Sequence, residues 1–162
     1  MIDWIDWISR GTTVLVIVTA IYGFYAWGKG ILPAVIRLGN GLSKRKIAIF
    51  AKGDELRSLE ELLLSSKLFN KKNITGISSV RDLESTEQAT LFLVSWLDWQ
   101  DHMTEVWHAK KGSTVLIVYA PPRSIPEDKM KELDGKRNVI VVNFRGRLLN
   151  DILVSLMTTG YQ

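Results

Sequence analysis

Residues 46–69, KIAIFAKGDELRSLEELLLSSKLF, contain a short apolar run, a polar turn and an amphipathic helix in direct succession. The run Lys46–Ala51 has the length and composition of a strand that is buried on both faces. The turn is Lys52-Gly53-Asp54, and leucines then recur at helical spacing up to Phe69, with Asp54 expected as the N-cap. A buried strand that leads at once into a helix is the repeating unit of parallel α/β sheets.

The same alternation continues to the end of the chain. Further strands are expected at Asn73–Ser79, Gln88–Ser95, Ser113–Ala120 and Asn138–Phe144, and further helices at Asp98–Lys110 (capped by Asp98), Pro126–Leu133 and Arg147–Thr158. This order predicts an α/β fold class: a flavodoxin-like, five-stranded parallel sheet with helices on both faces and strand order 2-1-3-4-5. About eight polar residues, Val80–Glu87, join the second and third strands, so that crossover is expected to be shortened or the second strand irregular.

A separate apolar stretch precedes the sheet. Residues 11–27, GTTVLVIVTAIYGFYAW, carry no charge and lie between Arg10 and Lys29. As a helix they would extend about 25 Å, near the lower end of what crosses a hydrocarbon core. Aromatic residues expected at the headgroup layers flank the stretch on both sides, namely Trp4, Trp7, Tyr22, Tyr25 and Trp27. We interpret it as one transmembrane helix; the alternatives are a buried core helix and a cleaved signal sequence, and the acidic start MIDWIDW disfavours the latter.

Charge predicts the orientation of this helix. Residues 1–46 hold six Lys/Arg and two Asp/Glu, a net charge of +4, whereas residues 47–162 hold fifteen of each sign. Five of the six cations follow the apolar stretch, and lysine and arginine stay on the cytoplasmic side. The N-terminus is therefore expected outside and the C-terminal domain in the cytoplasm, at a bacterial inner membrane. Anionic lipid is the partner expected for the basic excess, and nucleic acid is not.

Three regions are expected: an N-terminal segment with the transmembrane helix (1–29), a basic juxtamembrane linker (30–46) and the α/β domain (47–162). Gly28, Gly30 and Pro33 are expected to break or bend the helix. The apolar residues 31–42 either lie in the membrane interface or continue the span.

Several kinds of site are disfavoured by composition. The chain has no cysteine, and His102 and His108 are six residues apart, which does not place them on one helical face, so no metal site is expected. No phosphate-binding Walker motif, G-x-S-x-G or H-E-x-x-H occurs. A response-regulator site needs a lysine after the fifth strand, where this chain has Asn143-Phe144-Arg145.

Ligands of such sheets bind beyond the carboxyl ends of the strands where the strand order reverses, here between the first and third strands. Gly53 allows close approach of the backbone, and Lys52 beside a helix N-terminus favours an anion. Trp96 and Trp99 are expected to stack on a base; the alternative is that the aspartates are caps and the tryptophans are packing. Two arginines that open the last helix could clamp phosphate or be solvated. The candidate ligand-binding residues are Lys52, Gly53, Asp54, Ser95, Trp96, Asp98, Trp99, Arg145 and Arg147.

From Lys46 to about Pro122 the chain resembles the TIR and TIR-like nucleotide-sensing superfamily. The similar segments are IAIFAKGDELRSLEELLL, FLVSWLDWQDHMTEVWHA and TVLIVYAPP. Ser95 matches the serine that ends the third strand in that family, and Glu105 lies near the place of the glutamate that its NAD glycohydrolases use. The family's Trp-Cys-x-x-Glu pattern is absent, since His102, Met103 and Thr104 precede Glu105.

The resemblance implies a membrane-anchored sensor and effector that binds a nucleotide second messenger, with no other cofactor, and acts in bacterial anti-phage defence with a protein partner from the same operon. Self-association is expected through the helix face of Thr12, Thr19 and Gly23, because small residues let helices approach. The alternatives are a membrane-tethered NAD glycohydrolase that uses Glu105 as its catalytic residue, and a scaffold without catalytic activity.

Overall fold

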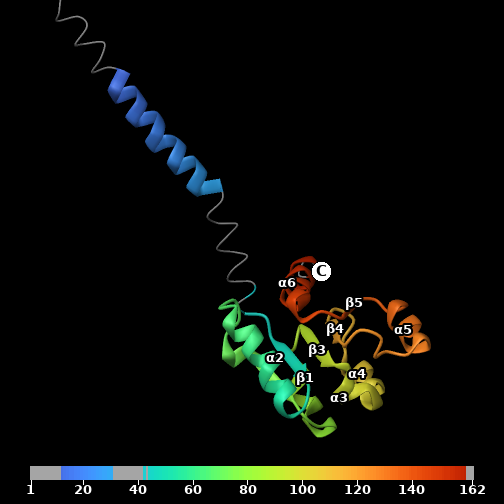
Figure 1. Cartoon of the computed structure of the whole chain (residues 1–162). Helices are drawn as coiled ribbons and strands as arrows, with labels where there is room; N and C mark the ends of the chain where they lie inside the picture. Colours follow the sequence, from blue (N-terminus) through green and yellow to red (C-terminus); the bar gives the residue numbers. More distant parts are fainter. Residues whose placement is uncertain (1–11, 31–41, 43, 160–162) are drawn as a thin grey trace, which may run out of the picture. The chain divides into compact units, whose positions relative to one another are not determined.

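The computed structural model describes residues 12–30, 42 and 44–159, and the chain divides into two compact units, residues 1–40 and 41–162 (Figure 1). The predictions made for Trp4, Trp7 and residues 31–41, including Pro33, lie outside the described residues.

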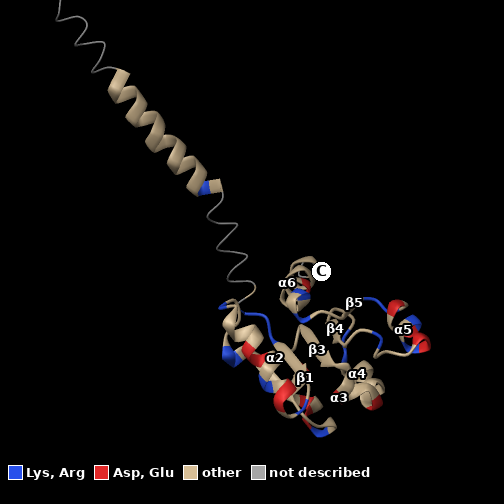
Figure 2. Ribbon diagram, viewed as in Figure 1, with Lys and Arg blue, Asp and Glu red and all other residues tan. Residues whose placement is uncertain are grey.

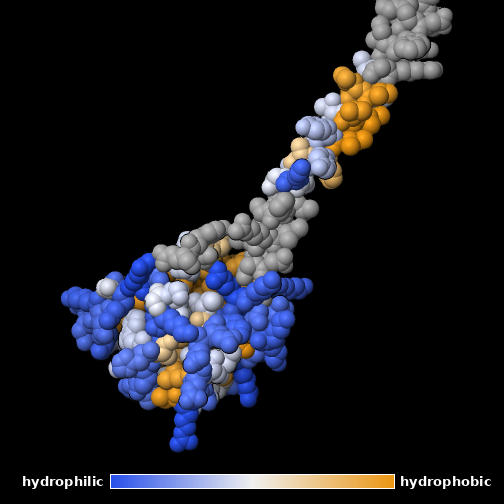
Figure 3. Space-filling view, turned by 180° about the vertical axis from the view of Figure 1, so that it is seen from behind, coloured by the Kyte–Doolittle hydropathy of each residue, from blue (hydrophilic) through white to orange (hydrophobic). Residues whose placement is uncertain are grey.

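In the described part of the first unit, residues 12–30, the helix Thr12–Gly30 is long and apolar enough to cross a membrane. Lys29 is its only charged residue (Figure 2). Figure 3 shows strongly apolar side chains over its first part and paler aromatic and glycine positions toward its end. Its side chains are not buried within the protein, as in a helix that faces lipid. Its length and composition are those of a helix that could cross a membrane. The helix continues through Gly28 to Gly30, so the break predicted at Gly28 is wrong.

The second unit is built on a five-stranded sheet in which every neighbouring pair is parallel. The spatial order is β2-β1-β3-β4-β5, as predicted. The strands are β1 (Ile47–Phe50), β2 (Ile74–Ile77), β3 (Leu91–Ser95), β4 (Val115–Tyr119) and β5 (Val139–Val142). Ile47 lies opposite Ile74 of β2 and Leu91 of β3, so the amino ends of these strands are level.

Helices cover both faces of the sheet (Figure 1). Helices α2 (Gly53–Ser65) and α6 (Arg145–Thr158) pack on one face, through leucines such as Leu59 and Leu148. The other face carries α3 (Trp96–Trp99), α4 (Met103–Ala109) and α5 (Glu127–Asp134). Alternate residues of β1 enter the two cores, Ile47 and Ile49 on one side and Ala48 and Phe50 on the other, and all four are fully buried.

The crossover from β2 to β3 is shortened, as predicted. It consists of one 3₁₀ helix, η2 (Val80–Thr86), in place of a full α-helix. A capping box opens it: the Ser79 N–H and hydroxyl both donate to the Asp82 carboxylate, at 3.1 and 3.0 Å. Two shorter 3₁₀ helices are η1 (Lys71–Asn73) and η3 (Gln100–His102).

The helices after β1, β3 and β5 begin one or two residues earlier than predicted, α5 begins one residue later, and both predicted aspartate caps are wrong. The N-cap of α2 is Lys52, and Asp54 lies in the first turn, exposed, 3.8 Å from Arg57. The helical segment after β3 begins at Trp96, so Asp98 lies within α3. Gly53, with its positive φ, lets the backbone turn into α2 before Asp54 is reached.

Candidate functional site

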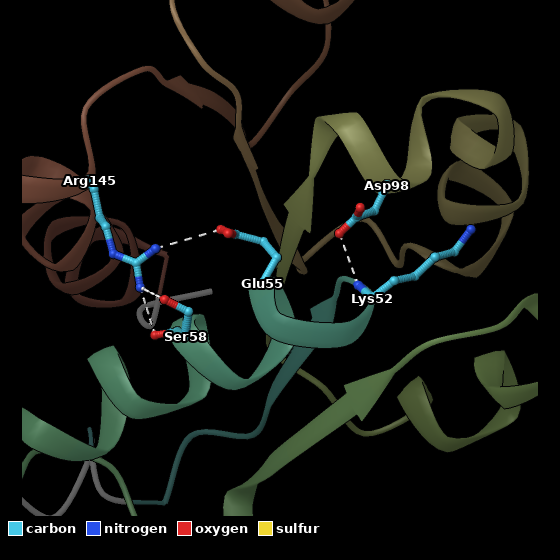
Figure 4. Close-up of polar contacts among 5 residues, drawn as sticks. All are labelled: Lys52, Glu55, Ser58, Asp98 and Arg145. Atoms are coloured by element: carbon cyan, nitrogen blue, oxygen red, sulfur yellow. Dashed lines mark hydrogen bonds and ion pairs between the residues drawn. The ribbon is translucent and has the colours of Figure 1, made fainter.

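The switch point lies at the carboxyl edge of the sheet between β1 and β3. Strand β1 has β2 on one side and β3 on the other, so the segments that leave β1 and β3 depart toward opposite faces. In open α/β sheets this divergence leaves a crevice where ligands bind. Figure 4 shows the polar residues gathered there.

A hydrogen bond joins the two sides of the switch point. The backbone N–H of Lys52, at the end of the β1 loop, donates to Oδ2 of Asp98 in α3, at 2.9 Å (Figure 4). Asp98 is half-buried, and its carboxylate fixes the loop after β1 against the helix after β3. The Lys52 side chain is exposed, so its ammonium group lies at the same edge and in contact with solvent.

Gly53 gives this loop its shape. Its φ is +51°, a left-handed conformation that other residues adopt only at a cost. A Cβ built on Gly53 would meet no atom within 4 Å, so the backbone there faces open space. The first N–H groups of α2 start at this position, and helix-initial N–H groups have no partner within their own helix.

Arg145 links the two helices of one face beside the switch point. Its guanidinium donates to the backbone oxygen of Ser58 at 2.8 Å and also to the Ser58 hydroxyl. The same guanidinium lies 3.7 Å from Oε1 of Glu55, as an ion pair (Figure 4). Oε1 of Glu55 is buried and has no hydrogen bond, although the Glu55 side chain as a whole is 35% exposed. Arg145 is therefore only partly satisfied by Glu55, and a ligand anion of better geometry could compete for it.

Sequence reasoning missed Glu55 and Ser58. Acidic residues are common in the first turn of a helix because they complement its dipole, so Glu55 looked ordinary. The contact between Ser58 and Arg145 joins residues 87 apart in sequence, and no local pattern predicts it. Arg147 is exposed and does not share this contact, so the structure does not bring the two arginines together as a clamp on these groups.

The two tryptophans lie in the second core. Trp99 is 0% exposed and packs its ring edge-on against Phe50, with centroids 5.1 Å apart. Trp96 is 3% exposed. Their indole Nε1 atoms are buried and have no hydrogen-bond partner. Their burial favours the packing interpretation over stacking on a base.

A small cavity adjoins Trp96, between α3, α4 and α5. Its volume is about 70 Å³, and Gln100, Trp107 and Lys129 are among its lining residues. A cavity of this size holds a few waters. At the switch point, the open edge near Lys52 and Arg145 is the candidate site for a larger ligand.

Two residues named by the resemblance lie apart from these contacts. Ser95 ends β3, is 4% exposed and pairs with Tyr119 of β4. Glu105 lies on α4 and is 38% exposed, with a carboxylate oxygen 3.6 Å from Nδ1 of His102. Within the described ranges, no three His, Asp or Glu side chains group so as to hold a metal ion.

We compared the chain with family models, curated proteins and solved structures, and none matches it.

Proposed function

We propose that this chain is a membrane-anchored, TIR-like sensor whose α/β domain binds an anionic, nucleotide-type ligand at the carboxyl edge between β1 and β3. The observation that supports this best is the convergence of three elements at that edge. Asp98 of α3 holds the β1 loop, and Arg145 of α6 holds α2. A ligand there would contact elements of both faces of the sheet at once.

Three groups at this edge could bind an anion, although the acids Asp54, Glu55 and Asp98 lie there too. Lys52 offers an exposed ammonium, the start of α2 offers backbone N–H groups, and Arg145 offers a guanidinium held only partly by Glu55. A phosphate that displaces Glu55 from Arg145 would alter the contact between α2 and α6. Binding would thereby change the packing of one face of the domain.

We propose that this edge binds a ligand and does not cleave NAD. Glu105 pairs with His102 of the preceding turn and lies on α4, whereas the anion-binding groups lie on α2 and α6. A Glu105→Ala variant separates the two roles: ligand binding at the edge is expected to persist. Loss of an NAD-cleaving activity in that variant would favour the enzyme instead.

Action at the membrane is proposed to require several copies, because a single helix encloses no path. The domain is proposed to lie in the cytoplasm, with the helix in a bacterial inner membrane, and the defence role follows from the family resemblance alone. The ligand would then act by changing how the domains associate.

Isothermal titration calorimetry of the full chain in detergent tests the binding site, with AMP, NAD and inorganic phosphate as probes. Lys52→Gln combined with Arg145→Gln is expected to weaken binding about 10- to 100-fold, because charge-assisted hydrogen bonds are lost. Lys131→Gln is the control, since Lys131 lies on α5 and pairs with exposed Glu127 at 3.3 Å. Absence of binding by all three probes, or equal affinity of the double variant and the control, would contradict the proposal.

A further inference from the structure

Basic residues gather at one edge of the sheet. Groups of two or three precede four of the five strands: residues 44–46 (KRK) before β1, 71–72 (KK) before β2, 110–111 (KK) before β4 and 136–137 (KR) before β5. Because the strands are parallel, their amino ends all lie at the same edge. We call these four groups the basic edge; the blue stretch that leads into β1 can be followed in Figure 2.

The opposite edge carries acids. The first turns of α2, α3 and α5 hold Asp54, Glu55, Asp98, Glu127 and Asp128. Lys52, Arg123 and Arg145 lie among these acids, so the carboxyl edge is mixed in charge, whereas the four groups that precede the strands at the amino edge are all basic. Helix dipoles favour bases after α4 and α5, but residues 71–72 lie beyond the last turn of α2, which ends at Ser65, so its dipole does not account for them.

Three lysines of the basic edge have contacts that do not neutralise their charge. The Lys46 ammonium donates to the side-chain oxygen of Gln88, and the Lys111 ammonium donates to the backbone oxygen of Glu87 at 2.5 Å. The Lys136 ammonium lies 5.4 Å from the centre of the Trp107 ring. All three acceptors are uncharged groups.

Cations of neighbouring strands also crowd one another at this edge. Burial, and secondarily the charge of Arg137, lowers the pKa of Lys110, so the amino ends of β4 and β5 bring like charges together. A hollow of about 260 Å³ opens between the amino ends of β1 and β2, and Lys46 and Lys72 line it together with Glu84 and Glu87. The two glutamates offset the two lysines within this hollow, so it is the basic edge as a whole, and not the hollow, that is complementary to a polyanionic layer.

The chain enters the domain at this edge. Residues 44–46 lead directly into β1, and the segment from Gly30 to Leu42 can span at most about 40 Å when fully extended. The basic edge is therefore the part of the domain that adjoins the tether to the membrane helix.

We propose that the basic edge docks on the anionic lipid headgroups of the membrane that the N-terminal helix crosses. This inference rests on the membrane anchoring in the proposed function. Docking turns the amino edge of the sheet toward the bilayer and leaves the carboxyl edge, with Lys52 and Arg145, open to a soluble ligand.

The test measures how close each edge lies to lipid in the full chain. The chain has no cysteine, so Ser113→Cys before β4 and Ser78→Cys after β2 each place a single donor dye at an exposed position on one edge. The chain is reconstituted in vesicles that contain an acceptor dye on a lipid headgroup, either in phosphatidylcholine alone or with about 30% phosphatidylglycerol. Carbonate extraction reports membrane anchoring separately.

We expect energy transfer from residue 113 to exceed that from residue 78 in the anionic vesicles. The excess should fall in phosphatidylcholine alone and in about 1 M salt, where the Debye length is about 3 Å. Each lysine beside an anionic surface changes partitioning about fivefold, so Lys44→Gln/Lys71→Gln/Lys72→Gln should reduce docking on the order of 100-fold. Arg57→Gln/Arg81→Gln/Arg123→Gln removes the same charge away from the basic edge and should leave docking intact.

Four outcomes separate the two ideas. Carbonate-resistant retention with the expected edge difference supports both anchoring and docking. If the chain resists carbonate extraction but energy transfer from the two edges is equal, or the two triple variants have equal effects, docking is overturned and membrane anchoring stands. If carbonate extracts the chain but energy transfer still differs between the edges in a salt-sensitive way, membrane anchoring is overturned and lipid binding by the basic edge stands. If carbonate extracts the chain and the two edges do not differ, both ideas are overturned.

Discussion

The backbone N–H of Lys52 and the carboxylate of Asp98 lie 2.9 Å apart and join the loop after β1 to the helix after β3. This bond crosses the point where the sheet reverses its strand order. It fixes the loop that contains Gly53, where an added Cβ would meet no atom within 4 Å. The preorganisation of the candidate site therefore depends on one side chain from the opposite side of the switch point.

Asp98→Ala is expected to lower the free energy of unfolding by about 1–2 kcal/mol, because the Lys52 N–H loses a charged acceptor. Asp98→Asn keeps an acceptor oxygen and should recover much of that loss. Urea unfolding of the full chain in detergent measures both, and amide hydrogen exchange at Lys52 should quicken in the alanine variant. Wild-type stability and exchange in Asp98→Ala would show that the bond does not hold the loop.

Trp99→Ala is expected to destabilise the domain by about 3–5 kcal/mol, since the ring is fully buried against Phe50. The neighbouring Leu97 is 57% exposed, and Leu97→Ala should cost less than about 1 kcal/mol. Urea unfolding compares the two variants. A small loss in Trp99→Ala accompanied by loss of ligand binding would restore the stacking interpretation of this residue.

The strands could be predicted because their composition is extreme. KIAIFA and STVLIVYA are too apolar and too short for anything but buried strands, and the intervening helices then dictate a parallel sheet. The start of each helix was less predictable. Asp54 and Asp98 are good caps by residue type. The helices nevertheless begin at Gly53 and Trp96, which precede these aspartates, so tertiary packing determined the boundary.

The candidate site was predictable in part for the same reason. Topology placed Lys52, Gly53 and Asp98 at one edge, because loops after adjacent parallel strands converge. Topology did not predict which residues at that edge contact one another. The pairing of Glu55 and Ser58 with Arg145 depends on how α2 and α6 lie side by side on the sheet, and neither helix carries a local signal for it.

Asp82 should make the stability of the η2 crossover depend on pH. Hydrogen bonds from the Ser79 hydroxyl, and then from backbone N–H groups, lower the pKa of Asp82 below its usual range. A depressed folded-state pKa gives stability that is present above the unfolded-state pKa and is lost as the pH falls through the folded-state value. Asp82→Ala should therefore melt a few degrees below wild type at neutral pH, and the difference should shrink in strong acid. Thermal unfolding across this pH range checks it; a difference that grows in acid would contradict the assignment.

Gly23→Leu combined with Thr19→Leu is expected to lower the oligomer order of the full chain, because larger side chains hold helix backbones apart. The Thr19 hydroxyl donates to the backbone oxygen of Leu15 at 2.8 Å within its own helix, so close approach at Gly23 should matter more than hydrogen bonds between helices. Mass photometry in nanodiscs measures the order, with Ile21→Leu as the control on the opposite face of the helix. An unchanged mass, or a monomeric wild type, would remove the self-association proposed here.

Amide hydrogen exchange of the full chain in nanodiscs, with and without saturating AMP, measures whether an anionic nucleotide-type ligand binds at the β1/β3 edge. We expect slower exchange at residues 52–57 and 145–149, no change at residues 136–139 on the opposite edge, and loss of the protection in Arg145→Gln. Protection confined to other segments, or equal protection in Arg145→Gln and wild type, would contradict binding at the β1/β3 edge.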